Sequence, residues 1–136
     1  MCPWVRLDDH LDDDSRIATV GPAGAGLLVL LLVYSNKTLA DGFVSEAIVQ
    51  QKALGLPNAA DVIASLVNVR LLARSERDGI DGYEIAEDLV KHQPTRESVL
   101  AAREVTRQRK ERWRAEQAAR LHTAQPKRRR RALRAV

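Results

Sequence analysis

The chain is poor in the residue types that build most metal and redox sites. Its single cysteine, Cys2, excludes an intramolecular disulfide and a zinc site made of several cysteines. The histidines are scattered, at His10, His92 and His122, and form no His-rich metal motif. We therefore expect a reduced intracellular protein that binds no metal.

Motifs of catalysis are missing as well. The sequence contains no Gly-rich phosphate loop, no HExxH motif and no GxSxG motif. Aromatic residues make up only 4% of the chain, so its core must be built from leucine, valine, isoleucine and alanine. We expect a protein that is not an enzyme and needs no cofactor.

One long uncharged run extends over 18 residues from Ile17 to Tyr34, which is just enough to span a bilayer. Three glycines and Pro22 crowd its first half, and the acidic residues 12–14 precede it, where a secretory signal begins with basic residues. We expect a helix from Pro22 to about Asn36 that is buried on all sides in a cytoplasmic protein without membrane contact. A membrane or targeting segment is the alternative.

Charge is divided unevenly along the chain. Residues 1–94 hold 8 Lys and Arg against 14 Asp and Glu, whereas residues 95–136 hold 14 Lys and Arg against 4 Glu. An acidic body therefore precedes a strongly basic arm. Such an asymmetry indicates a polyanionic partner.

Patterns of apolar residues and turn signals predict the elements of the body. Residues 4–7 alternate like a short strand, and residues 8–14 form an acidic loop whose Asp or Ser15 caps a helix. A short strand at Phe43-Val44, helices over 45–54 and 58–70 and a hairpin over 71–86 follow. Two turn signals, Asp78-Gly79 and Asp81-Gly82, place the tip of this hairpin between Arg77 and Gly82. This order predicts a mainly α domain with a small β-hairpin, a winged helix-turn-helix, in residues 1–94.

The arm begins after Gln93-Pro94, where proline disfavours helix in the residue before it. Thr95 is expected to cap a polar, basic, solvent-exposed helix over 95–122, with Glu and Arg pairs at helical spacing such as Glu104–Arg107. Pro126 should break this helix, which leaves residues 123–136 as a disordered polybasic tail.

Several segments resemble a known family. The opening residues 4–10, the segment 41–44, the wing exit 83–85 with Asp88, and the linker 93–97 are similar to small winged-helix proteins of actinobacterial phages and prophages. These are similar to the N-terminal domains of phage replisome organisers, which bind origin DNA and recruit helicase-loading machinery. The resemblance implies a DNA-binding role in replication or transcription control and a phage or host replication or transcription protein as a second partner.

Nucleic acid, in particular duplex DNA, is the partner that the charge pattern favours. Phosphate contacts are expected from the arm, at Arg103, Arg107, Arg109, Lys110, Arg112, Arg114, Lys127, Arg128, Arg129, Arg130 and Arg131. Further phosphate contacts are expected from the wing, at Arg74 and Arg77, and base contacts from the second helix of the motif, at Asn58, Ser65, Asn68 and Arg70.

Alternatives remain open for the arm and the body. Trp113 stacks on an exposed base or covers an apolar patch of its own domain. The arm is otherwise a solvated end or a contact for an anionic membrane or an acidic protein. The body, which is acidic, is alternatively an adaptor domain that docks a host protein.

Overall fold

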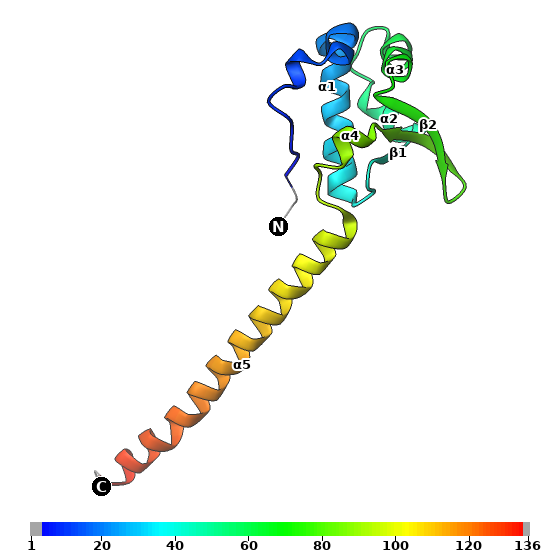
Figure 1. Ribbon diagram of the computed structural model, residues 1–136. Coiled ribbons are helices and arrows are strands. Elements are labelled where there is room, and N and C mark those ends of the chain that lie inside the picture. The colour runs from blue at the N-terminus through cyan, green and yellow to red at the C-terminus, as the bar shows by residue number, and fades with distance from the viewer. Residues whose placement is uncertain (1–3, 135–136) are drawn as a thin grey trace. The chain divides into compact units, whose positions relative to one another are not determined.

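The computed structural model describes residues 4–134, with side chains for residues 4–124 (Figure 1). The chain divides into two compact units, Met1–Val99 and Leu100–Val136, so the division falls shortly after the boundary expected at Pro94. The elements are a 3-10 turn (Leu11–Asp13), α1 (Ser15–Thr38), β1 (Phe43–Ser45), α2 (Glu46–Lys52), α3 (Ala59–Asn68), β2 (Leu72–Arg77), β3 (Ile80–Ile85), α4 (Glu87–Val90) and α5 (Arg96–Arg134). The predicted class, mainly helical with a small antiparallel sheet, is confirmed.

Helix α1 begins at Ser15, well before the predicted start at Pro22. The Asp14 carboxylate caps it by accepting a hydrogen bond of 2.8 Å from the Arg16 amide. The helix is interrupted at Gly21, whose φ of 72° lies in the left-handed region that favours glycine. Pro22 therefore stands in the first turn of a second helical segment, where its missing N–H costs nothing.

Only one face of α1 is buried. Its buried leucines, which contribute to an aliphatic core shared with the sheet and the other helices of the body, are Leu27, Leu28, Leu31 and Leu32. Leu30 and Val33 are 48% and 43% exposed, so the expectation of burial on all sides is wrong. The helical spacing explains this difference in exposure. Residues three and four apart share a helix face, so Leu27, Leu28, Leu31 and Leu32 lie on one face, whereas residues 30 and 33 lie on the opposite face.

Among the described helices, α1 is long and apolar enough to cross a membrane, judged by length and composition alone. Core helices of soluble proteins meet the same criterion. Signal sequences near an N-terminus meet it too. Four leucines of α1 are buried in the core of the body.

The three strands form an antiparallel sheet in the order β1-β3-β2. The hairpin turn is Asp78-Gly79, with φ values of 54° and 76°, the positive pair that a tight two-residue turn requires. The second turn signal, Asp81-Gly82, instead lies inside β3. A Cβ atom at Gly82 would lie 2.4 Å from the Val44 carbonyl oxygen, so glycine here permits the close approach of β1.

The helix pair ends earlier than the sequence predicts. Helix α2 ends at Lys52, and α3 ends at Asn68 rather than at residue 70. Arg70 adopts a φ of 63°, which turns the chain from α3 toward β2. Asn58 precedes α3 with a φ of 55° and makes no side-chain capping bond.

The N-terminal segment forms no strand in the described residues, contrary to the prediction for residues 4–7. A side chain takes the place of a partner strand: Gln93 accepts from the Arg6 amide at 3.0 Å and donates to the Arg6 carbonyl at 2.6 Å. The Asn36 side chain donates to the same Gln93 oxygen at 2.9 Å. We call these hydrogen bonds of Gln93 with Arg6 and Asn36 the amide clamp. It holds Arg6 of the N-terminal segment to Gln93, which lies 87 positions later in the sequence.

Helix α4 was not predicted and is held to α1 by charge. The Arg16 guanidinium lies 2.7 Å from an Asp14 oxygen and 2.6 Å from an Asp88 oxygen. Hydrogen bonds from Arg16 lower the pKa of both carboxyl groups, and those two carboxylates raise the pKa of Arg16.

Candidate nucleic-acid interface

The basic residues expected to contact phosphates lie on α5. Thr95 caps this helix as predicted, since its hydroxyl oxygen accepts from the Ser98 amide at 3.1 Å. A second cap comes from the loop after α1, where the Asp41 carboxylate accepts from the Arg96 amide at 2.7 Å. Two side chains, those of Thr95 and Asp41, therefore accept hydrogen bonds from backbone amides in the first turn of α5.

The cations of α5 are exposed and unevenly distributed around its axis. Arg103, Arg107, Lys110 and Arg114 follow one another at spacings of four and three residues and share one face. Arg109 and Arg112 point to the other side of the helix. We call the first group the cationic stripe.

Arg107 differs from the rest of the stripe because it is paired within the helix. Its guanidinium lies 2.6 Å from Glu104 and 2.9 Å from Glu111. Hydrogen bonding to Glu104 raises the pKa of Arg107 and lowers that of Glu104. Among the described side chains, the ion pairs of α5 are these two, so Arg103, Arg109, Lys110, Arg112 and Arg114 present their charge to solvent.

The helix continues further than expected. Its backbone remains helical through Pro126 to Arg134, whereas the sequence predicts an end near His122 and a disordered tail over 123–136. The residues on both sides of Pro126 are mostly good helix formers, which favours continuation. The predicted phosphate contacts Lys127, Arg128, Arg129, Arg130 and Arg131 lie on this stretch, and their side chains fall outside the described residues.

The two wing arginines have structural partners on the body. Arg77 donates to the Ala40 carbonyl at 2.6 Å, pairs with Glu84 at 3.1 Å and lies over the Phe43 ring at 5.0 Å. Arg74 lies over the Tyr83 ring at 5.4 Å. The hairpin tip is instead exposed and acidic at Glu76, Asp78 and Asp81. A phosphate would therefore meet carboxylates at the tip of the wing.

The four residues expected to contact bases are not gathered at one point. Asn58 and Asn68 stand at opposite ends of α3, Ser65 is half-buried, and Arg70 lies beyond the helix. Only Asn68 faces the cavity between the helix pair and the hairpin.

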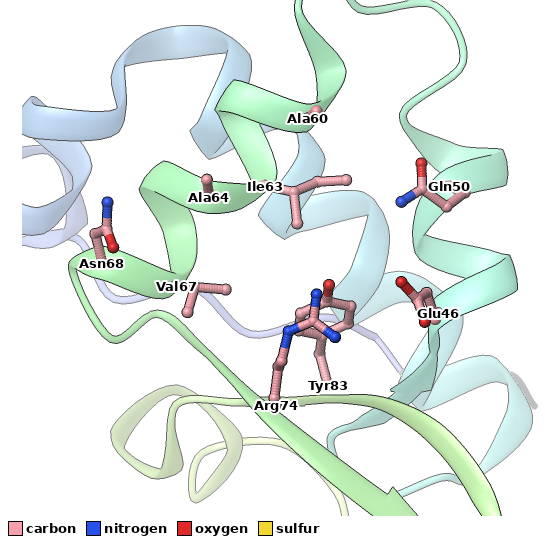
Figure 2. A pocket seen from close by; sticks show the side chains of 9 residues that line it. All are labelled: Glu46, Gln50, Ala60, Ile63, Ala64, Val67, Asn68, Arg74 and Tyr83. Atoms are coloured by element: carbon pink, nitrogen blue, oxygen red, sulfur yellow. The ribbon is translucent and has the colours of Figure 1, made fainter.

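That cavity has a volume of about 280 Å³ and is open to solvent between α2, α3 and the strands (Figure 2). It is lined by Glu46, Gln50, Ala60, Ile63, Ala64, Val67, Asn68, Arg74 and Tyr83. Figure 2 shows the small side chains of Ala60 and Ala64 on the α3 side and Glu46 and Gln50 opposite, with Arg74 below. Sequence reasoning did not find Glu46, Gln50 or Tyr83, because no spacing relates residues that only the tertiary fold brings together.

Comparison with models of protein families, with curated proteins and with solved structures finds no match to this chain. The interpretation of the site therefore depends on the geometry and charges described above.

Proposed function

We propose that the chain is a non-enzymatic, cytoplasmic nucleic-acid-binding protein that holds duplex DNA through the phosphate contacts of α5. The observation that carries the proposal is the set of exposed cations on α5, of which Arg103, Arg109, Lys110, Arg112 and Arg114 have no carboxylate partner among the described side chains. Arginine guanidinium groups match phosphate geometry, and release of counterions on binding supplies affinity for any sequence. The acidic body cannot supply this affinity.

The body fits the proposal as a winged helix-turn-helix. The element order α1-β1-α2-α3-β2-β3 and the strand order β1-β3-β2 are those expected of such a domain. The resemblance to phage and prophage proteins adds a role in replication or transcription control. In this proposal the base contacts come from α3, with Asn68 best placed, and contribute selectivity rather than affinity.

A salt titration of duplex binding tests the proposal. Each phosphate contact contributes about −0.9 to the slope of log K against log salt, so replacing Arg103, Lys110 and Arg114 with glutamine should flatten the slope by about 2–3. The matched control replaces Arg6, Lys37 and Lys91, which are exposed cations of the body, and removes the same total charge. Its slope should equal that of the wild type.

Equal slopes for the two triple variants would show that only net charge matters and would remove the cationic stripe from the interface. An absence of duplex binding by the wild type at low salt would overturn the proposal.

The cavity supports a second candidate, an adaptor that docks a host or phage replication or transcription protein. The exposed side of α3 carries small, uncharged Ala60 and Ala64 at the cavity, and the hairpin tip is acidic. Such a surface suits a protein better than a phosphate backbone. Replacement of Ala64 with lysine separates the two functions, because it strengthens duplex binding if α3 lies against DNA and blocks protein docking if the cavity receives a partner.

A further inference from the structure

Trp113 is an exposed aromatic residue on an otherwise charged helix. Its side chain is 61% exposed, and it is the single aromatic residue between positions 96 and 136. An indole exposed to water on such a charged helix presents a large apolar face.

The neighbours of Trp113 define what kind of ligand this face can accept. Arg109 and Lys110 stand one turn before it, and Glu116 and Gln117 stand one turn after it. An apolar protein groove that received the indole would have to desolvate these charges as well, which is costly. A ligand with a flat apolar face next to negative charge would leave Arg109 and Lys110 paired.

The large apolar side chains that are exposed on the described part of α5 argue against pairing with a second copy of the helix. Leu100, Val105 and Leu121 are exposed by 43%, 53% and 68%. At about 100° per residue, each lies about 80° or more away from Trp113 around the axis. They form no continuous seam with the indole, which a helix pair requires.

We infer that Trp113 is a stacking platform for an unpaired base of single-stranded DNA, whose flanking phosphates bind Arg109 and Lys110. Every base offers a π-face, so the contact needs no particular sequence. The inference rests on the proposed function and deepens it: the cationic stripe holds the phosphates of a duplex, whereas Trp113 binds where a strand has separated.

Intrinsic fluorescence provides the test on the full-length chain. Replacing Trp4, which is 82% exposed, with phenylalanine leaves Trp113 as the sole tryptophan, which is excited at wavelengths that the two tyrosines do not absorb. Two probes of equal length and charge are used, an oligomer of deoxythymidine and an oligomer in which every nucleotide is abasic. We expect the thymidine oligomer to quench Trp113 and to bind more tightly, and the abasic oligomer to do neither.

Variants of Trp113 complete the experiment. Replacement with leucine should weaken binding of the thymidine oligomer by about 5- to 150-fold and change binding of the duplex and the abasic oligomer by less than about twofold. Phenylalanine should restore most of the loss. Replacement of Leu121 with alanine, another exposed apolar position of α5, serves as the control and should have no effect.

Equal affinity for the two oligomers, with duplex binding retained, overturns the stacking inference and leaves the proposed function standing. A similar loss of both oligomers in the leucine variant overturns it too, since the effect would then not come from the base. An absence of binding to all three nucleic acids overturns the proposed function itself.

Discussion

Replacement of Leu31 with alanine tests which face of α1 is buried. Leu31 is 0% exposed in the aliphatic core, while its neighbour Leu30 is 48% exposed. Deletion of a fully buried leucine side chain costs about 2–5 kcal/mol, because apolar contacts are lost and a cavity remains. The same deletion at Leu30 removes atoms that are already half in water, and should cost less than about 1 kcal/mol.

Calorimetry on the intact chain measures the difference. For a unit of this size each kcal/mol lowers the melting temperature by about 4–8 °C, so a loss of about 3 kcal/mol at Leu31 predicts a shift of about 12–24 °C. The shift for Leu30→Ala should stay below about 8 °C. Equal shifts for the two variants would refute the reasoning, because they would mean that another surface covers the outer face of α1.

Three further predictions concern the body. Gly82→Ala should destabilise the sheet and lower the melting temperature, whereas Gly26→Ala, where an added Cβ meets nothing within 4 Å, should raise stability by up to about 1 kcal/mol. Hydrogen bonding to Arg16 lowers the pKa of Asp88 from its ordinary value of 3.8, so the ion pair contributes its full stability above that pH and loses it as the pH falls through the lowered pKa. In a thermal titration the difference in melting temperature between wild type and Asp88→Asn should narrow as the pH falls below 3.8. Arg77→Leu should lower the melting temperature, because the contacts of Arg77 with Ala40, Glu84 and Phe43 are lost. It should leave the salt slope of DNA binding unchanged. A flatter slope would show that Arg77 contacts phosphate after all.

The body shows what local patterns can predict and where they stop. The Asp78-Gly79 turn and the cap at Thr95 depend on neighbouring residues, and the sequence predicts both; for the cap of α1 it leaves an Asp of the acidic loop and Ser15 as alternatives, and the structure has Asp14. Asp81-Gly82 carries the same turn signal but lies in a strand, because the approach of β1 is a tertiary contact that outweighs it. A local signal thus predicts an element only where no distant part of the chain competes.

In the candidate site, too, the sequence predicts the local features and misses those that depend on tertiary contacts. The exposure of the arginines on α5 follows from their polar surroundings, which the sequence shows directly. The hydrogen bond from Arg77 to the Ala40 carbonyl could not be predicted, because the two residues are 37 positions apart and come together only when the sheet has formed. The cavity beside α3 is lined by residues of four separate elements, α2, α3, β2 and β3, so no sequence spacing predicts it.

The amide clamp at Gln93 has a consequence for how the body folds. It joins residues 87 positions apart, so almost the whole body must be enclosed in one loop before its bonds can form. Closure of a long loop costs conformational entropy that only later contacts offset. The N-terminal segment should therefore dock after the core has assembled and detach before it melts, which makes it the first cooperative unit to exchange its amide hydrogens with solvent.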